Sequence, residues 1–172
     1  MSIKAARING IEVSVCGVGE LPDFAGQGVT HVVSLWDGYH ADDPKPRQLI
    51  SSIFPVAQVH FGFFNDVFTR FSGDYAPQLE AIREILTFTS GLRGGNYLLL
   101  HCAVGVSRSA AMTFATLCQH AGPGFEADCF RALIQIRPSA SPNPLIVEFA
   151  DELLGRDGAM IASTKGKREP SE

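Results

Sequence analysis

Apolar positions along the chain follow two spacings, one typical of strands and one typical of helices. Four short apolar or β-branched runs are bounded by Gly, Pro or polar clusters, and they predict strands at 11–16, 30–35, 57–63 and 97–102. Over 74–91 the apolar residues recur at helical spacing. We therefore predict a helix there, with Asp74 as its N-cap and Gly91 at its end.

The second half of the chain predicts helices alone. Segments rich in Gly and Pro separate three helical stretches, at 108–121, 124–136 and 143–155. The charged, turn-rich stretch 36–46 predicts a surface loop, and 163–172 predicts a flexible charged tail. Strands that alternate with helices, followed by helices alone, are typical of the α/β class. We expect a mostly parallel central sheet of four to five strands, flanked by helices, in a single domain over 1–162.

Composition and charge narrow the choice of partners. The chain has 172 residues, 45% hydrophobic and 19% charged, with a net charge of −4, so it has no basic field that would hold nucleic acid. No signal peptide or membrane span is visible, and we expect no membrane insertion. The four cysteines form no CxxC pair, which disfavours both zinc and a disulfide framework. These features predict a cytoplasmic protein with reduced thiols.

The stretch "HCAVGVSRSA" joins the last predicted strand to a predicted helix. A loop in this position directs several backbone N–H groups and the positive end of the helix dipole toward one point, which favours anion binding. If Cys102 lies at the base of this loop, the same field favours its thiolate form. Arg108 offers a planar fork of donors that matches two oxygens of a phosphoryl group, and Gly105 permits close backbone approach. This chemistry suggests phosphoryl transfer to sulfur.

The same stretch resembles the signature loop of the cysteine-dependent protein tyrosine and dual-specificity phosphatases, in which Arg and then Ser or Thr follow Cys after five residues. "FGFFND" resembles the general-acid region of that family, and "ALIQIRPSASPN" resembles the segment that links its last helices. The resemblance implies a phosphotyrosine phosphatase-like sheet flanked by helices, and a phosphocysteine intermediate formed without metal or other cofactor.

The resemblance also implies a role for each residue of the loop. Cys102 would be the nucleophile and Arg108 the phosphate clamp. Ser109 would donate to the sulfur and ease its departure, and His101 would orient the loop and poise the thiolate. The phosphate cradle would be formed by the amides of Ala103, Val104, Gly105, Val106, Ser107 and Arg108.

A general acid must protonate the leaving oxygen, and Asp66 is the first candidate because it follows the strand at 57–63. The receptor-like members of the family carry Trp-Pro-Asp there, whereas this chain has Phe64-Asn65-Asp66, which is closer to the short dual-specificity type. Asp74 is the competitor, although a helix cap would hold it away from the pocket. The next candidates lie in the 36–46 loop, and they are Asp37, Asp42 and Asp43.

Three classes of function follow from these residues. The favoured one is a phosphatase for protein phosphotyrosine, with or without phosphoserine and phosphothreonine, that releases inorganic phosphate. A phosphatase for phosphoinositides or small phosphorylated metabolites is the alternative, but its members often carry lysines within the loop, which "CAVGVSR" lacks. A non-catalytic phosphate-binding module is disfavoured because Cys102, Arg108 and an acid candidate are all present.

Overall fold

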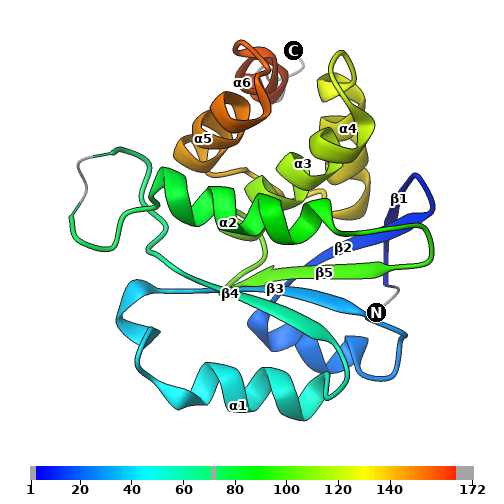
Figure 1. The fold of residues 1–172 in the computed structure, drawn as a ribbon, viewed down its shortest axis with the longest axis vertical. Coiled ribbons are helices and arrows are strands. Elements are labelled where there is room, and N and C mark those ends of the chain that lie inside the picture. Colours follow the sequence, from blue (N-terminus) through cyan, green and yellow to red (C-terminus); the bar gives the residue numbers. More distant parts are fainter. Residues whose placement is uncertain (1–2, 71–72, 166–172) are drawn as a thin grey trace.

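A computed structural model describes residues 3–70 and 73–165. At its centre lies a sheet whose five strands are β1 (Ala6–Ile8), β2 (Ile11–Gly17), β3 (His31–Trp36), β4 (Gln58–Phe63) and β5 (Tyr97–Cys102). Their order in the sheet is β1-β2-β5-β3-β4 (Figure 1). Strands β2 to β5 are parallel, and β1 pairs antiparallel with β2. The four predicted strands are confirmed, and β1 was missed because three residues are too few to show a period.

Helices cover both faces of the sheet, as predicted (Figure 1). One face carries α2 (Leu79–Ser90), α3 (Arg108–Ala121), α4 (Glu126–Ile136), α5 (Pro144–Leu154) and α6 (Ala159–Lys165). The opposite face carries α1 (Pro44–Ile53) and the 3-10 helix η1 (Val18–Phe24). A second 3-10 helix, η2 (Gly38–His40), lies between β3 and α1. The α/β architecture with a mostly parallel sheet is therefore confirmed.

Helix α1 corrects the prediction of a surface loop over 36–46. Pro44 opens the helix, where its missing N–H costs nothing, and the Asp43 carboxylate caps the N–H of Lys45. Only Pro46 and Ile50 are buried, so the apolar period is too sparse to reveal the helix. Helix α6 was also missed, and it includes the first residues of the tail expected at 163–172. The rest of that tail lies outside the described residues.

The predicted N-cap of α2 was wrong. The helix begins at Leu79 after Gln78, and Asp74 is an exposed residue of the preceding turn. Pro77 explains the late start, because a proline disfavours helical geometry in the residue before it. Gly91 does end the helix, as predicted.

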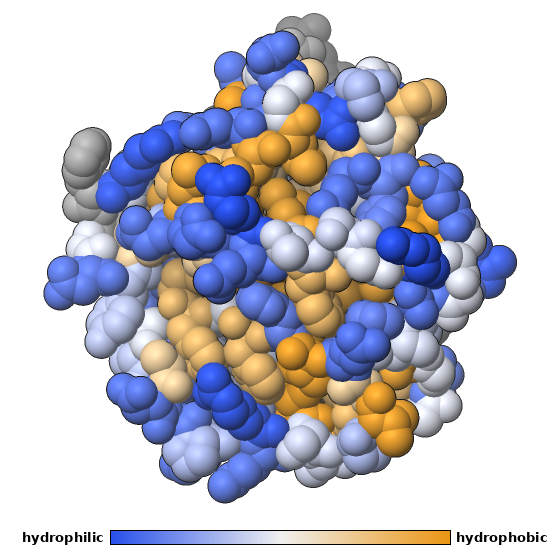
Figure 2. Space-filling view, viewed as in Figure 1, coloured by the Kyte–Doolittle hydropathy of each residue, from blue (hydrophilic) through white to orange (hydrophobic). Residues whose placement is uncertain are grey.

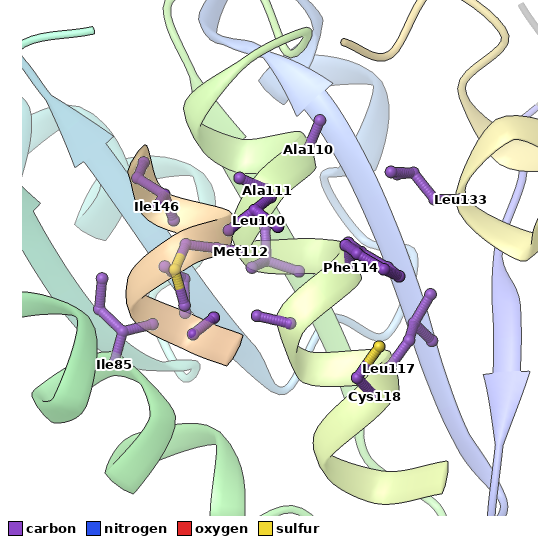
Figure 3. Close-up of a cluster of buried hydrophobic side chains, with 14 of the residues drawn as sticks. Ile85, Leu100, Ala110, Ala111, Met112, Phe114, Leu117, Cys118, Leu133 and Ile146 are labelled. Carbon is purple, nitrogen blue, oxygen red and sulfur yellow. The ribbon is translucent and has the colours of Figure 1, made fainter. Parts of the chain in front are cut away.

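Helix α3 is the centre of the larger hydrophobic core. Every residue from Arg108 to Cys118 is buried, so the helix is enclosed on all sides rather than lying on the surface. Figure 3 shows its side chains meeting those of β5, α2, α4 and α5, and the labelled residues are Ile85, Leu100, Ala110, Ala111, Met112, Phe114, Leu117, Cys118, Leu133 and Ile146. This packing fixes the N-terminus of α3 at the carboxyl end of β5.

Strand β4 forms the edge of the sheet, and most of its side chains are only partly buried. In Figure 2, which has the view of Figure 1, hydrophobic surface runs through the middle of this face between more hydrophilic regions. None of the described helices has the length and apolar character that spanning a bilayer requires.

Candidate active site

The loop between β5 and α3 packs tightly against the end of β2. Gly105 has φ +77°, and a Cβ built on it would lie 2.4 Å from the carbonyl carbon of Cys16 and 2.5 Å from the backbone nitrogen of Gly17. Gly17 is also constrained, although less tightly, because its Cβ would lie 2.9 Å from the backbone of Val104. Only glycine fits these two positions, and the neighbouring strand therefore fixes the course of the loop.

The backbone carbonyls of this loop point away from its centre. Each accepts a hydrogen bond from outside the loop: Ala103 from Val18, Val104 and Gly105 from the Arg137 guanidinium, Val106 from Ser141, and Ser107 from Asn143. In a trans peptide the following N–H points opposite to the carbonyl. The amides of residues 104–108 are therefore directed inward, whereas the Ala103 amide belongs to a peptide plane that these bonds do not orient. That these amides bind phosphate stays a prediction.

The Cys102 sulfur lies at the base of this cradle, and only 3% of the residue is exposed. Its Sγ is 3.1 Å from the Ser109 hydroxyl and accepts a hydrogen bond of 3.3 Å from the Gly105 amide. Burial alone would raise the pKa of the Cys102 thiol, but hydrogen bonds from Ser109 and Gly105, together with the Arg108 charge, lower it below the usual value. The site therefore favours the thiolate.

The guanidinium of Arg108 is buried beside the cradle, with 4% of its side chain exposed. Nη1 donates to the Asp37 carboxylate and to the backbone carbonyl of Phe64, each at 2.8 Å. Nε is buried and has no hydrogen-bond partner among the described residues. A buried guanidinium with an unsatisfied donor is suited to an oxyanion ligand.

The Asp66 carboxylate is held at the rim of the same loop. Its Oδ1 accepts hydrogen bonds from the Ser107 hydroxyl and from Nδ2 of Asn143, each 2.7 Å long. The other acid candidates are placed differently. Asp37 is ion-paired with Arg108, and Asp43 caps α1. Asp42 is an exposed residue of the β3–α1 loop, and Asp74 is an exposed residue of the β4–α2 loop.

Similarity to known proteins agrees with this geometry, although no family model matches the chain. Protein phosphatase Slingshot homolog 3 of Rattus norvegicus is 31% identical over 139 residues, which cover 76% of this chain and 20% of that protein. The chain thus spans about a fifth of its relative's length. Tk-PTP in its active form has a TM-score of 0.59 at 24% identity, covering 91% of this chain and 99% of that one.

A further solved structure, human DUSP28, has a TM-score of 0.60 at 21% identity and covers 90% of this chain and 94% of that one. The chain has a dual-specificity phosphatase-like fold. In this phosphatase-like fold the loop from Cys102 to Arg108 occupies the carboxyl end of the central strand β5, where open parallel sheets usually bind their ligands.

Arg137 and Glu20 hold the loop between β5 and α3 in place, and neither residue was identified from the sequence. Arg137 donates through Nη1 and Nη2 to the Glu20 carboxylate at 2.8 and 2.9 Å, and it also donates to the carbonyls of Val104 and Gly105. Glu20 in turn accepts from the Gly17 amide. Arg137 lies within "IRPSASPN", so the segment was noticed, but a partner in η1 is not visible from sequence.

Asn143 was also missed, because its partner Asp66 lies 77 residues earlier in the chain. It is fully buried, and its Oδ1 caps α5 by accepting from the amides of Leu145 and Ile146. Its Nδ2 donates to Asp66 and to the carbonyl of Val67. Asn143 therefore ties the segment that carries Asp66 to the start of α5.

His101 lies behind the loop rather than in the cradle. The Ser34 hydroxyl accepts from the indole N–H of Trp36 and forms a 2.7 Å hydrogen bond with Nε2 of His101. Burial, with a smaller effect of the Arg108 charge, lowers the pKa of His101 to about 4. The imidazole is therefore neutral at neutral pH.

A cavity of about 170 Å³ lies beside the loop between β5 and α3. Cys102 and Arg108 line its base, and Trp36, Tyr39 and His40 line one wall. Within the described residues, no three His, Cys, Asp or Glu side chains cluster as a metal site would require.

Proposed function

We propose that this protein is a cysteine-dependent phosphatase that hydrolyses phosphate monoesters, chiefly protein phosphotyrosine, with or without phosphoserine and phosphothreonine. One observation carries the proposal. The Cys102 sulfur lies in a cradle of inward amides beside the unsatisfied Nε of Arg108, and its pKa is lowered despite burial. This is the arrangement that a thiolate nucleophile and a bound phosphoryl group require.

In the first step the Cys102 thiolate attacks phosphorus, an S–P bond forms, and the P–O bond to the leaving group breaks. Arg108 and the amides of residues 104–108 stabilise the equatorial oxygens, where the charge is spread. Asp66 gives its proton to the leaving oxygen. Because Oδ1 already accepts two hydrogen bonds, Oδ2 is the oxygen that carries this proton.

In the second step water attacks the phosphocysteine. The Asp66 carboxylate takes a proton from the water, the S–P bond breaks, and inorganic phosphate leaves. The Ser109 hydroxyl, 3.1 Å from Sγ, stabilises the departing thiolate. Both steps use only groups of this chain, without metal.

The proposal extends to domain and compartment. Residues 1–162 act as one phosphatase domain, which is supported by a continuous core that joins β1, the central strands and α2 to α6. A cytoplasmic location is supported by the four cysteines, all in the described part of the chain, which are buried as free thiols. The net charge of −4 gives no support to a nucleic-acid partner.

Turnover of a panel of phosphate esters tests the proposal. Wild-type protein should hydrolyse a phosphotyrosine peptide and p-nitrophenyl phosphate faster than a nucleotide or a phosphoinositide, should keep its activity in chelator, and should be inhibited by vanadate. Cys102→Ser should abolish turnover while retaining phosphate affinity, and Arg108→Lys should be severely impaired because a point charge cannot replace a two-pronged clamp. An active Cys102→Ser protein, or activity lost in chelator and restored by zinc, would overturn the mechanism.

A further inference from the structure

Large apolar side chains are exposed on the loops that follow the carboxyl ends of β3, β4 and β5, at the edge of the sheet where Cys102 lies. Seven such side chains are exposed in the described part of the chain, and four of them belong to these three loops. We call these four the apolar rim: Tyr39 (65% exposed), Phe68 (59%), Tyr75 (50%) and Val104 (67%). Exposed apolar residues scattered singly are normal on a protein surface, but four on loops that share one edge of the sheet are typical of a binding site.

The structure holds the loops of this rim in place. The ring of Tyr75 packs against Gly38, where a built Cβ would lie 2.1 Å from the ring. The side-chain oxygen Oδ1 of Asn65 accepts from the backbone N–H of Gly38, and the backbone N–H of Asn65 donates to the carbonyl of Tyr75. These two bonds join the β3–α1 and β4–α2 loops. Asn143 fixes the carbonyl of Val67, next to Phe68. The exposed rings are therefore presented on anchored backbone.

The charges on the same loops are unfavourable for an acidic ligand. Asp42 and Asp74 are exposed on the two loops that carry Tyr39 and Tyr75. The arginines nearest to these loops are engaged, since Arg70 pairs with Glu148 and Glu152, and Arg47 lies over the rings of Phe61 and Phe63. Lys45 is exposed at the start of α1, but the two loops that carry Tyr39 and Tyr75 themselves bear the exposed carboxylates of Asp42 and Asp74, which repel acidic side chains.

We propose that the apolar rim docks the residues that flank the phosphotyrosine, and that it selects apolar flanking side chains over acidic ones. The inference rests on the proposed function and adds to it the chemistry of the substrate segment. Tyr39 lines the cavity, and the Tyr75 ring packs against Gly38 directly before it, so residues that flank a ring in the cavity would meet the apolar rim first at these two side chains.

Binding to the Cys102→Ser protein, measured by fluorescence anisotropy, tests this selection. Three phosphotyrosine peptides of equal length carry Leu, Ser or Glu on both sides of the phosphotyrosine. We expect the Leu peptide to bind about tenfold more tightly than the Ser peptide, from the burial of apolar surface. The Glu peptide should bind most weakly, and its disadvantage should shrink as salt is added.

A rim variant and a matched control locate the effect. Phe68→Ser should reduce the preference for the Leu peptide by about threefold or more without changing binding of the Ser peptide. Phe125→Ser removes a ring of similar exposure, 53%, from the start of α4 and should change neither. In the background with intact Cys102, the control variant Phe125→Ser should leave turnover of p-nitrophenyl phosphate unchanged.

The proposed selection would be overturned if the three peptides bound equally well, if the Glu peptide bound most tightly, or if none of them bound. It would also be overturned if Phe68→Ser and Phe125→Ser had the same effect. Failure of the proposed function has a different signature. It would be seen as wild-type protein that hydrolyses no phosphate ester at all, whereas the order of peptide affinities is measured without turnover.

Discussion

Asp66→Asn separates the proposed proton donor from the structure around it. Oδ1 of Asp66 accepts 2.7 Å hydrogen bonds from Ser107 and Asn143. Asparagine keeps an acceptor oxygen that can occupy this position, so both bonds can be retained. The amide group replaces only the second oxygen, which carries the transferred proton. The variant should therefore fold like the wild type and lose the acid alone.

The size of the effect depends on the leaving group. General acid catalysis contributes about 100-fold to 10,000-fold. Tyrosine, with a pKa near 10, leaves poorly without a proton, whereas a nitrophenol leaves readily unaided. We expect Asp66→Asn to slow phosphotyrosine cleavage by about 100-fold or more, and to slow cleavage of p-nitrophenyl phosphate by less than about tenfold.

The assay compares kcat for aryl phosphates of graded leaving-group pKa in three aspartate variants. Asp74→Asn should leave turnover unchanged and stability within about 0.5 kcal/mol, because Asp74 is exposed and caps no helix. Asp37→Asn should lower kcat/KM about tenfold for every leaving group, because its carboxylate holds Arg108 at 2.8 Å. An equal loss for all leaving groups in Asp66→Asn, or a graded loss in Asp74→Asn or Asp37→Asn, would refute the assignment of Asp66.

Three further substitutions or treatments test the architecture of the loop. Gly105→Ala should destabilise the protein by about 3 kcal/mol or more in urea denaturation, because its Cβ would lie 2.4 Å from backbone atoms. Gly124→Ala is the control: Gly124 has φ +91° but open space around it, so the variant should lose about 1–2 kcal/mol. Equal losses in the two variants would contradict the packing argument. Arg137→Met should lower the free energy of unfolding by about 2–4 kcal/mol, because two loop carbonyls and the Glu20 carboxylate lose a charged donor. The control Arg131→Met removes only an exposed ion pair and should lower it by less than about 1 kcal/mol. Alkylation of Cys102 by iodoacetamide should rise with pH around a midpoint below that of free cysteine measured in parallel, because hydrogen bonds and the Arg108 charge lower the pKa of the thiol. A midpoint at or above that of free cysteine would contradict the lowered pKa.

The sequence alone reveals most of the sheet and the centre of the site. The four predicted strands carry short runs rich in β-branched or apolar residues, and α3 carries a clear helical stretch, so local pattern and tertiary structure agree there. Cys102, Arg108 and Ser109 could be found because they belong to one continuous stretch that runs from the end of β5 through a tight loop to the first turn of α3. Helix α1 could not, because its stabilising features are a cap and an N-terminal proline rather than an apolar period.

The tertiary structure decided which residues support that loop. Glu20 and Arg137, Asp37 and Arg108, and Asp66 and Asn143 are far apart in the chain, and no local pattern pairs them. Their contacts exist because parallel strands bring their carboxyl ends to one edge of the sheet, where loops from distant segments converge. Sequence periodicity encodes which face of an element is buried, whereas the partner of a charged side chain depends on how the elements pack. The sequence therefore determined the stretch from Cys102 to Ser109, and only the fold determined that Asp66 is held by Ser107 and Asn143 and that Asp37 pairs with Arg108.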